Sequence, residues 1–378
     1  MKNQKEFIGF NSINKLKEVL SEYAPKNIFL VTGKNSFQAS GAAVVLEELL
    51  SGYRIINFSD FSINPNSDDL KKGIEYFKKN PSDMVIACGG GSAIDMAKLI
   101  NVFSVQPGNF MDYIKDGKSI SVKPRTLVAI PTTSGSGSEA THFAIIYIDK
   151  IKYSVAHEYI LPDVAIIDPQ FMLNLPGYVT ASSGIDALSQ AVESYWCVNS
   201  TAESKAFAKE AIGIILKNLP EAVNRPSKKS REEMAIAAHL SGKAINITKT
   251  TAPHAISYPL TSFFKLSHGH AVGMLMPEIL VYNSEVNDWD VVDKRGAKYV
   301  KDTIKELNVL FGAGDNEEAE SLIKDFMKSI GLATRLGEIG IREPDIEKIL
   351  DNVDPDRLGN NPRRLTRQAL KTILKKLL

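Results

Sequence analysis

Histidine and carboxylate side chains with the spacing of metal ligands are concentrated in the second half of the sequence. Three of the six histidines, His254, His268 and His270, lie within one stretch of seventeen residues. Earlier in the chain, Asp186 and Gln190 are four positions apart, so a helix would place both side chains on one face. An aspartate, two histidines and one further oxygen donor would suit a divalent transition metal. The alternative is that each histidine is an ordinary core or surface residue, and the spacing alone leaves both interpretations open.

Two polar, glycine-rich segments in the first half each follow a run of β-branched residues. The first contains Gly89, Gly90, Gly91 and Ser92, with Asp95 shortly after, and the second contains Thr132, Thr133 and Ser136. Glycines let the backbone approach a ligand closely, and a helix N-terminus presents free N–H groups to a phosphate. Because the carboxyl ends of parallel strands share one edge of a sheet, two such loops predict a nucleotide site there. The alternative is a pair of tight structural turns.

The elements that would position these residues change in type near residue 176. Before it, short apolar runs alternate with helical stretches, and the expected strands are 27–32, 54–58, 84–88, 126–131, 143–148 and 164–168. Several of these runs are apolar without alternation, which is typical of parallel strands covered on both faces. The alternation of strands and helices predicts a parallel, doubly wound sheet. The segment 143–153 instead indicates a hairpin, with Asp149 and Lys150 near its turn.

After residue 176 almost no strand signal remains. Long apolar-periodic stretches predict helices, among them 184–196, 202–219, 231–246, 254–264 and 271–282. We take the first of these to begin at a capping pattern over residues 183–186. The sequence therefore predicts an α/β domain over residues 1–176 and an all-α domain over residues 177–378.

Composition excludes several classes of function. The 378 residues include 45 basic and 44 acidic ones, so there is no bulk electrostatic attraction to nucleic acid or to an anionic membrane. We find no transmembrane run and no apolar signal core, and expect no membrane association and no secretion. The only two cysteines, Cys88 and Cys197, have no CxxC spacing and fit a reducing compartment. We therefore expect a cytoplasmic protein that acts on a small molecule.

Together these motifs resemble the iron-containing alcohol dehydrogenase family, over nearly the whole chain. Residues 89–98 are similar to the coenzyme loop of that family, and residues 131–139 to its P-T-T-x-G-[ST]-G-S-E loop. Residues 184–188 and 254–277 look like its two metal motifs. The resemblance implies an N-terminal NAD(P)-binding α/β domain and a helical metal-binding domain, as in dehydroquinate synthase-like folds. It also implies Fe²⁺, with Zn²⁺ as an alternative, and a homodimer.

Carried over to this sequence, the four metal ligands of the family fall on Asp186, Gln190, His254 and His268. Gln190 departs from the family, which usually has a histidine there, and an amide oxygen is a weaker and harder donor than imidazole. Tyr258 stands where the family often has a further histidine, and we expect it to line the substrate pocket. His270 is the candidate for a proton relay.

A cation near the expected metal indicates the kind of substrate. Lys249 stands five residues before His254, and Thr250 and Thr251 adjoin it. A lysine beside hydroxyl groups suggests an anionic substrate tail, and the alternative is that Lys249 points to solvent. Residues 186–196 and 242–254 resemble the phosphonoacetaldehyde reductase branch of the family, which forms 2-hydroxyethylphosphonate in phosphonate biosynthesis.

The branch resemblance implies reduction of phosphonoacetaldehyde by NAD(P)H, with a metal that polarises the carbonyl. Lys249 and Thr250 would hold the phosphonate, and Lys249 would also act during catalysis. Three alternatives stay open: a dehydrogenase for uncharged short-chain alcohols and aldehydes, a dehydroquinate synthase-like lyase, and a non-catalytic binding protein.

Gly33 carries a clue to the choice of coenzyme. It directly follows the expected strand 27–32, where many NAD-specific members of the family have an aspartate. A carboxylate there would repel the 2′-phosphate of NADPH, and Gly33 removes that repulsion while Lys34 could attract the phosphate. We therefore expect NADPH to be accepted, with NADH as the alternative.

Overall fold

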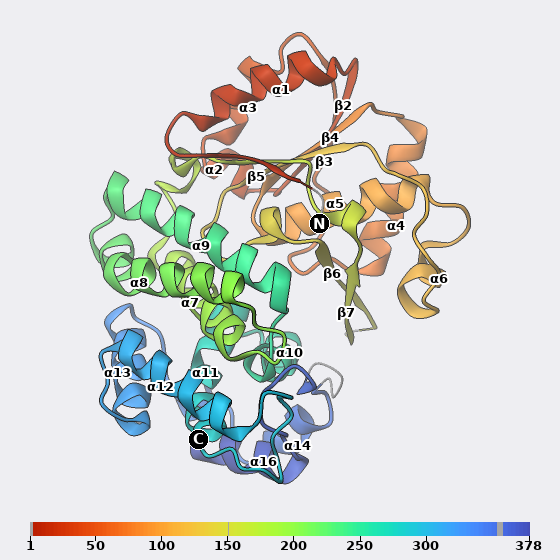
Figure 1. Cartoon of the computed structure of the whole chain (residues 1–378). Helices are drawn as coiled ribbons and strands as arrows, with labels where there is room; N and C mark the ends of the chain where they lie inside the picture. Colours follow the sequence, from red (N-terminus) through yellow and green to blue (C-terminus); the bar gives the residue numbers. More distant parts are fainter. Residues whose placement is uncertain (1–2, 150, 354–357) are drawn as a thin grey trace. The chain divides into compact units, whose positions relative to one another are not determined.

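The computed structural model of the chain describes residues 3–149, 151–353 and 358–378. Contacts divide the chain into two compact units, Met1–Leu175 and Pro176–Leu378, which are drawn in Figure 1. Lys150, expected near a hairpin turn, lies outside the described residues. Among the described residues, no helix combines the length and the apolar character that crossing a membrane requires.

A six-stranded parallel sheet forms the centre of the first unit, in the order β1-β8-β5-β4-β2-β3 (Figure 1). The strands are β1 (Lys5–Ile8), β2 (Asn27–Thr32), β3 (Arg54–Phe58), β4 (Met84–Gly89), β5 (Thr126–Pro131) and β8 (Val164–Ile167). The predicted parallel sheet is confirmed. The sequence did not predict β1, because this edge strand is short and mostly exposed and has no apolar run.

Helices cover both faces of this sheet. They are α1 (Leu16–Tyr23), α2 (Ser36–Ala39), α3 (Ala42–Leu49), α4 (Ser67–Lys79), α5 (Gly91–Val105) and α6 (Phe110–Lys115). Ile28 and Leu30 of β2 belong to one apolar core, and Phe29 and Val31 belong to another. Successive side chains of a strand point to opposite faces, so burial of all four explains the uninterrupted apolar run in the sequence.

The predicted hairpin is confirmed as a separate two-stranded sheet. Strands β6 (Phe143–Ile148) and β7 (Ile151–Ala156) pair antiparallel, with Ile148 opposite Ile151. Asp149 begins the turn with φ 51°, a left-handed conformation that aspartate tolerates better than most residues. Residues 143–148 therefore do not join the parallel sheet, although their apolar run resembles those of its strands.

The second unit is helical throughout its described part, apart from one isolated bridge. Its helices are α7 (Gly177–Trp196), α8 (Ala202–Asn224), α9 (Lys228–Thr248), α10 (Ala252–Phe264), α11 (His268–Ser284), α12 (Ala297–Phe311), α13 (Asn316–Ser329), α14 (Asp345–Leu350) and α16 (Arg367–Lys376). Helix α7 is buried along most of its length and packs against α8, α9 and α11. The all-α architecture predicted from the sequence is confirmed.

The predicted start of α7 near residue 184 is wrong, because the helix begins at Gly177. Gly184 suggested a helix boundary, but it lies inside the helix. A Cβ atom at Gly184 would come within 2.3 Å of Leu219 Cδ1 on α8. The glycine is therefore required for close packing of α7 on α8 rather than for a break in α7.

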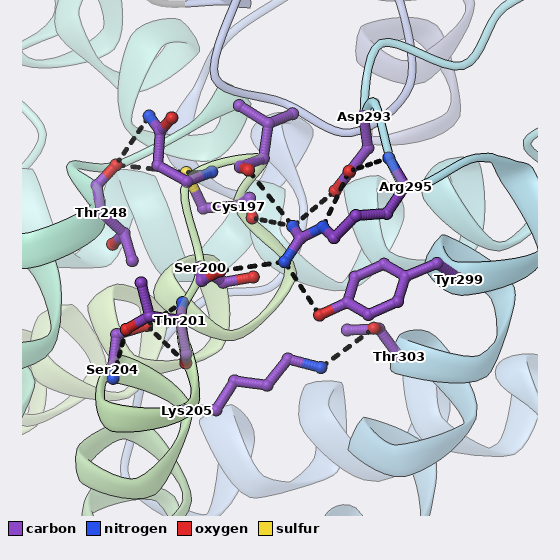
Figure 2. Close-up of polar contacts among 12 residues, drawn as sticks. Cys197, Ser200, Thr201, Ser204, Lys205, Thr248, Asp293, Arg295, Tyr299 and Thr303 are labelled. Carbon is purple, nitrogen blue, oxygen red and sulfur yellow. Dashed lines mark hydrogen bonds and ion pairs between the residues drawn. The ribbon is translucent and has the colours of Figure 1, made fainter.

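The segment after α7 is fastened to two other parts of the same unit (Figure 2). The guanidinium of Arg295 donates to the carbonyl oxygens of Cys197 and Ser200 and pairs with Asp293 at 2.6 Å. The Cys197 thiol donates to the Thr248 carbonyl at the end of α9. These contacts fix the C-terminal end of α7 against the end of α9.

Candidate functional site

Three potential metal ligands converge in the second unit. Asp186 lies on α7, His254 lies in the first turn of α10, and His268 begins α11. Each offers one ligand atom, and these atoms lie within 4.8 Å of one another. His254 Nε2 is 3.4 Å from Asp186 Oδ1. Two imidazoles and a carboxylate at this spacing fit one divalent transition metal ion.

Glycine allows α11 to approach α7 at this point. A Cβ atom at Gly269 would lie 2.0 Å from the carbonyl oxygen of Ser182 and 2.6 Å from Asp186 Cβ. One turn later, a Cβ atom at Gly273 would lie 2.6 Å from Ile185 Cγ1. Side chains at these two positions would push the helices apart. The neighbouring His268 therefore reaches Asp186 because α11 presents two glycines to α7.

Gln190, the fourth predicted ligand, is buried one turn after Asp186. Its Nε2 atom donates to Asp186 Oδ2 at 3.3 Å. Rotation of the terminal amide exchanges its oxygen and nitrogen, so the same side chain can turn an oxygen toward a metal. Its role as a ligand stays a prediction.

Two carboxylates determine the electrostatics of His254. Glu193 contacts its Nδ1 atom, and Asp186 lies near Nε2. Burial by itself lowers the pKa of His254, but the two carboxylates outweigh burial and raise this pKa to about 9. The surroundings of His254 therefore favour a positive charge, and a bound metal would replace the proton.

Tyr258 and Lys249 lie on the elements that carry this cluster. Tyr258 is buried on α10, and its ring stacks on His268 with centroids 6.0 Å apart. Lys249 is exposed in the turn between α9 and α10, next to the half-buried Thr250. The backbone of Lys249 has φ 65° and ψ 179°, a conformation that is common only for glycine.

His270 is held by contacts outside the ligand cluster. Its Nε2 atom lies 2.8 Å from the Ala333 carbonyl oxygen, which can only accept, so Nε2 carries a proton. Its Nδ1 atom then accepts from the Tyr178 hydroxyl at 3.3 Å. Residues two apart on a helix do not share a face, so His270 points away from the direction of His268. A proton relay through His270 stays a prediction that these contacts do not support.

In the first unit, the structure brings the predicted coenzyme loops together. A Cβ atom at Gly89 would lie 3.4 Å from the Gly33 nitrogen. One at Gly90 would lie 3.4 Å from Thr133 Oγ1, and one at Gly91 would lie 2.7 Å from Ser136 Oγ. The loops after β2, β4 and β5 are therefore in contact, and glycine is needed where they approach most closely.

These loops lie at a switch in the direction of the chain. From β2 the chain passes to β3 on one side, and from β4 it passes to β5 on the other. Ligands of open parallel sheets bind at the carboxyl ends of strands at such a switch point. Helix α5 begins here at Gly91 and has no side-chain cap. Its first N–H groups therefore suit a phosphate.

Other predicted coenzyme residues contact protein groups. The Asp95 carboxylate accepts from the Ser138 hydroxyl and from the Ile145 nitrogen, and burial raises its pKa. Ser92 Oγ accepts from the backbone nitrogen of a neighbouring loop at 3.3 Å. Thr132 Oγ1 is buried without a hydrogen-bond partner among the described residues. Direct contact of these residues with a coenzyme stays a prediction.

Two residues of these sites lie in the motifs identified in the sequence, but the sequence analysis assigned neither of them a role. Lys98 is fully buried and donates to the carbonyl oxygens of Thr141 and Phe143, which fastens the segment after the β5 loop to α5. Glu193 is fully buried against His254. The sequence did contain a signal for Glu193, because Asp186, Gln190 and Glu193 have the i, i+4, i+7 spacing of one helical face.

Two family models of known proteins match the chain, one in each of its two units. Residues 3–169 match the family model "iron-containing alcohol dehydrogenase", and residues 180–378 match the C-terminal model of the same family. The chain is 31% identical to long-chain-alcohol dehydrogenase 1 of Geobacillus thermodenitrificans, over 93% of this chain and 89% of that protein. It is 30% identical to NAD-dependent methanol dehydrogenase of Bacillus methanolicus, over 98% and 97% of the two chains.

A solved structure is similar in fold over the whole chain. It is sulfoacetaldehyde reductase from Bifidobacterium kashiwanohense in complex with NAD⁺, with a TM-score of 0.88 and 29% sequence identity. The similarity covers 100% of this chain and 97% of that one.

Proposed function

The chain belongs to the iron-containing alcohol dehydrogenase family of NAD-dependent oxidoreductases, and from this premise we propose that it reduces an anionic aldehyde to a primary alcohol. We propose phosphonoacetaldehyde as the substrate and 2-hydroxyethylphosphonate as the product. The nicotinamide of NAD(P)H gives a hydride to the carbonyl carbon, and water supplies the proton to the oxygen. The reaction consumes one aldehyde, one NAD(P)H and one proton.

Asp186, His254 and His268 would hold the divalent metal, with Gln190 as the candidate fourth ligand. When bound, the metal supplies a Lewis acid for the carbonyl oxygen. The family favours iron, and zinc is the alternative. In the first unit, the uncapped start of α5 at Gly91 would receive the pyrophosphate.

The backbone of Lys249 is the observation that carries the choice of an anionic substrate. Its φ of 65° and ψ of 179° lie in a region that costs a non-glycine residue about 1 to 3 kcal/mol. Glycine would adopt this conformation at little cost, and we propose that lysine stands here because its charge binds the substrate. The turn leads directly into α10, which carries His254. Lys249 would therefore bind the phosphonate, with Thr250 beside it and Tyr258 lining the pocket.

The named activity of one structural relative supports an anionic aldehyde. Sulfoacetaldehyde, the substrate in that protein's name, carries a tetrahedral sulfonate next to the aldehyde, as phosphonoacetaldehyde carries a phosphonate. The names of the sequence relatives support the second candidate, a dehydrogenase for uncharged alcohols. The two candidates differ in whether Lys249 is needed.

The test is the initial rate of coenzyme oxidation by the Fe²⁺-loaded protein with phosphonoacetaldehyde, sulfoacetaldehyde and butanal. Lys249→Gly should relieve the backbone strain yet lower kcat/KM for phosphonoacetaldehyde by roughly 10- to 100-fold, because a hydrogen bond to a charged group contributes about 1.5 to 3 kcal/mol. Its kcat/KM for butanal should not fall.

Lys265→Gly is the matched control, since Lys265 is also exposed and has φ 57° at the end of α10. It should leave the kcat/KM for both substrates unchanged. Equal turnover of butanal and the phosphonate by the wild type, with no effect of Lys249→Gly, would favour the uncharged-substrate candidate.

We also propose that NADPH is accepted, because Gly33 offers no carboxylate to repel a 2′-phosphate and the adjacent Lys34 is exposed. The family resemblance supports a homodimer, which light scattering on the purified protein would test. Two free, buried thiols, Cys88 and Cys197, suit the cytoplasm as the location.

A further inference from the structure

We propose that Glu193, Thr251 and Trp196 form a positioning chain that fixes the orientation of His254 for metal binding. This inference rests on the metal site of the proposed function. Glu193 is fully buried on α7, seven residues after Asp186, and its Oε1 atom contacts His254 Nδ1. Its other oxygen, Oε2, accepts from the Thr251 backbone nitrogen at 2.7 Å and from the Thr251 hydroxyl at 2.9 Å.

The directions of these hydrogen bonds follow from the groups involved. The Trp196 indole can only donate, and its Nε1 atom lies 2.9 Å from Thr251 Oγ1. The Thr251 hydroxyl therefore accepts from Trp196 and donates its own proton to Glu193. Two donors then occupy Glu193 Oε2, which leaves Oε1 for His254.

This arrangement selects one form of the His254 ring. An ionised carboxylate can only accept, so Nδ1 of His254 must carry a proton. In the neutral ring the lone pair is then on Nε2, the atom that lies 3.4 Å from Asp186 Oδ1 in the ligand cluster. A carboxylate partner of this kind orients a ligating imidazole and increases its basicity.

The positioning chain also connects the turn at Lys249 to the proposed metal ligand His254. Thr251 is the residue before α10 and ends the turn that begins at Lys249, the proposed phosphonate residue. Its backbone nitrogen and its hydroxyl are both held by Glu193, which lies on the helix of Asp186. The positioning chain therefore sets the place of the Lys249 turn relative to the ligands.

The experiment measures Co²⁺ binding and its visible spectrum in the full-length protein, so it does not depend on turnover. In Glu193→Gln, Thr251 would hold the amide oxygen and the amide nitrogen would face His254 Nδ1. That contact favours a proton on Nε2, which blocks the ligand atom. We expect Co²⁺ affinity to fall by roughly 10- to 100-fold.

A second set of variants keeps the test valid if Glu193→Gln folds poorly. Thr251→Val removes the hydroxyl and should weaken Co²⁺ binding by roughly 10-fold and alter its spectrum, whereas Thr251→Ser keeps the hydroxyl and should restore both. Thr303→Val is the matched control, because Thr303 is a buried threonine of the same unit whose hydroxyl accepts from Lys205 on α8. It should bind Co²⁺ as the wild type does.

The outcomes separate this inference from the proposed function. Wild-type affinity and spectrum in both Glu193→Gln and Thr251→Val would overturn the positioning chain and leave the proposed function intact. Failure of the wild type to bind Co²⁺ or Fe²⁺, or metal binding that Asp186→Asn leaves unchanged, would overturn the metal site and this inference with it. Weaker Co²⁺ binding in Glu193→Gln and Thr251→Val, with rescue in Thr251→Ser, would support the positioning chain and the metal site on which it rests.

Discussion

A single added methyl group at Gly269 should disrupt the proposed metal site. In Gly269→Ala the new Cβ atom would lie 2.0 Å from the Ser182 carbonyl oxygen and 2.6 Å from Asp186 Cβ, whereas ordinary contacts are 3.4–4 Å. Both atoms belong to the buried helix α7 and cannot move independently of it. Helix α11 must therefore shift away from α7 by about 1 Å or more, and His268 shifts with it.

Two separate losses should follow from this shift. Overpacking of this kind typically costs about 1 to 3 kcal/mol, which should lower the melting temperature of the metal-free protein by several degrees. A displacement of about 1 Å at a reacting centre can also cost roughly 100-fold in rate. We therefore expect Gly269→Ala to melt earlier, to bind Co²⁺ more weakly and to reduce aldehyde slowly.

Gly213→Ala is the matched control for this prediction. Gly213 also lies inside a helix, α8, but nothing lies within 4 Å of a Cβ atom there. The same substitution should stabilise the protein by about 0.5 to 1 kcal/mol and leave Co²⁺ binding unchanged. If Gly269→Ala melted and bound metal as the wild type does, the close approach of α11 to α7 would not be what constrains the site.

Two further predictions concern the first unit. Gly33→Asp should raise the ratio of kcat/KM for NADH to kcat/KM for NADPH by roughly ten-fold or more. The new carboxylate and the 2′-phosphate of NADPH are like charges, which repel by about 1 to 4 kcal/mol when they are a few ångströms apart. An unchanged ratio would show that residue 33 does not face the 2′-phosphate. Burial lowers the pKa of Lys98 to about 8, against the attraction of Asp95 and Glu139, whereas the unfolded value is 10.5. Between pH 8 and 10.5 the unfolded chain therefore binds more protons than the folded protein, so the free energy of unfolding rises with pH. Relative to Lys98→Met, the wild type should gain up to roughly 3 kcal/mol of this free energy across that range, with no gain below pH 8. Urea unfolding of both proteins at several pH values measures this difference, and a constant difference would contradict it.

The central strands could be predicted because both of their faces are buried. Successive side chains of β2, β4 and β5 point alternately into two cores, and nearly all of them are buried. The sequence of these strands therefore shows apolar runs without alternation. The edge strand β1 has no such constraint. Its residues are mostly exposed, and only its pairing with β8 makes it a strand.

The proposed ligand residues could be selected by type from the sequence, but their arrangement in space could not. The spacing of Asp186 and Gln190 depends only on helix geometry. The approach of His268 depends on a tertiary contact at Gly269, which the sequence does not reveal as a packing position. Glu193 was missed because glutamate in a helix is usually solvated, and only its burial against His254 indicates a role.

The spacing of three residues of the site is set by one helix, α7, and not by a set of loops. Asp186, Gln190 and Glu193 stand on successive turns of one continuous, buried helix, so they are separated by a fixed rise of about 1.5 Å per residue. A different side chain at one of these turns leaves the residues at the other two turns in place. Gln190, where the sequence resemblance implies a histidine in the family, would therefore change one proposed coordination position and leave Asp186 and Glu193 where they are.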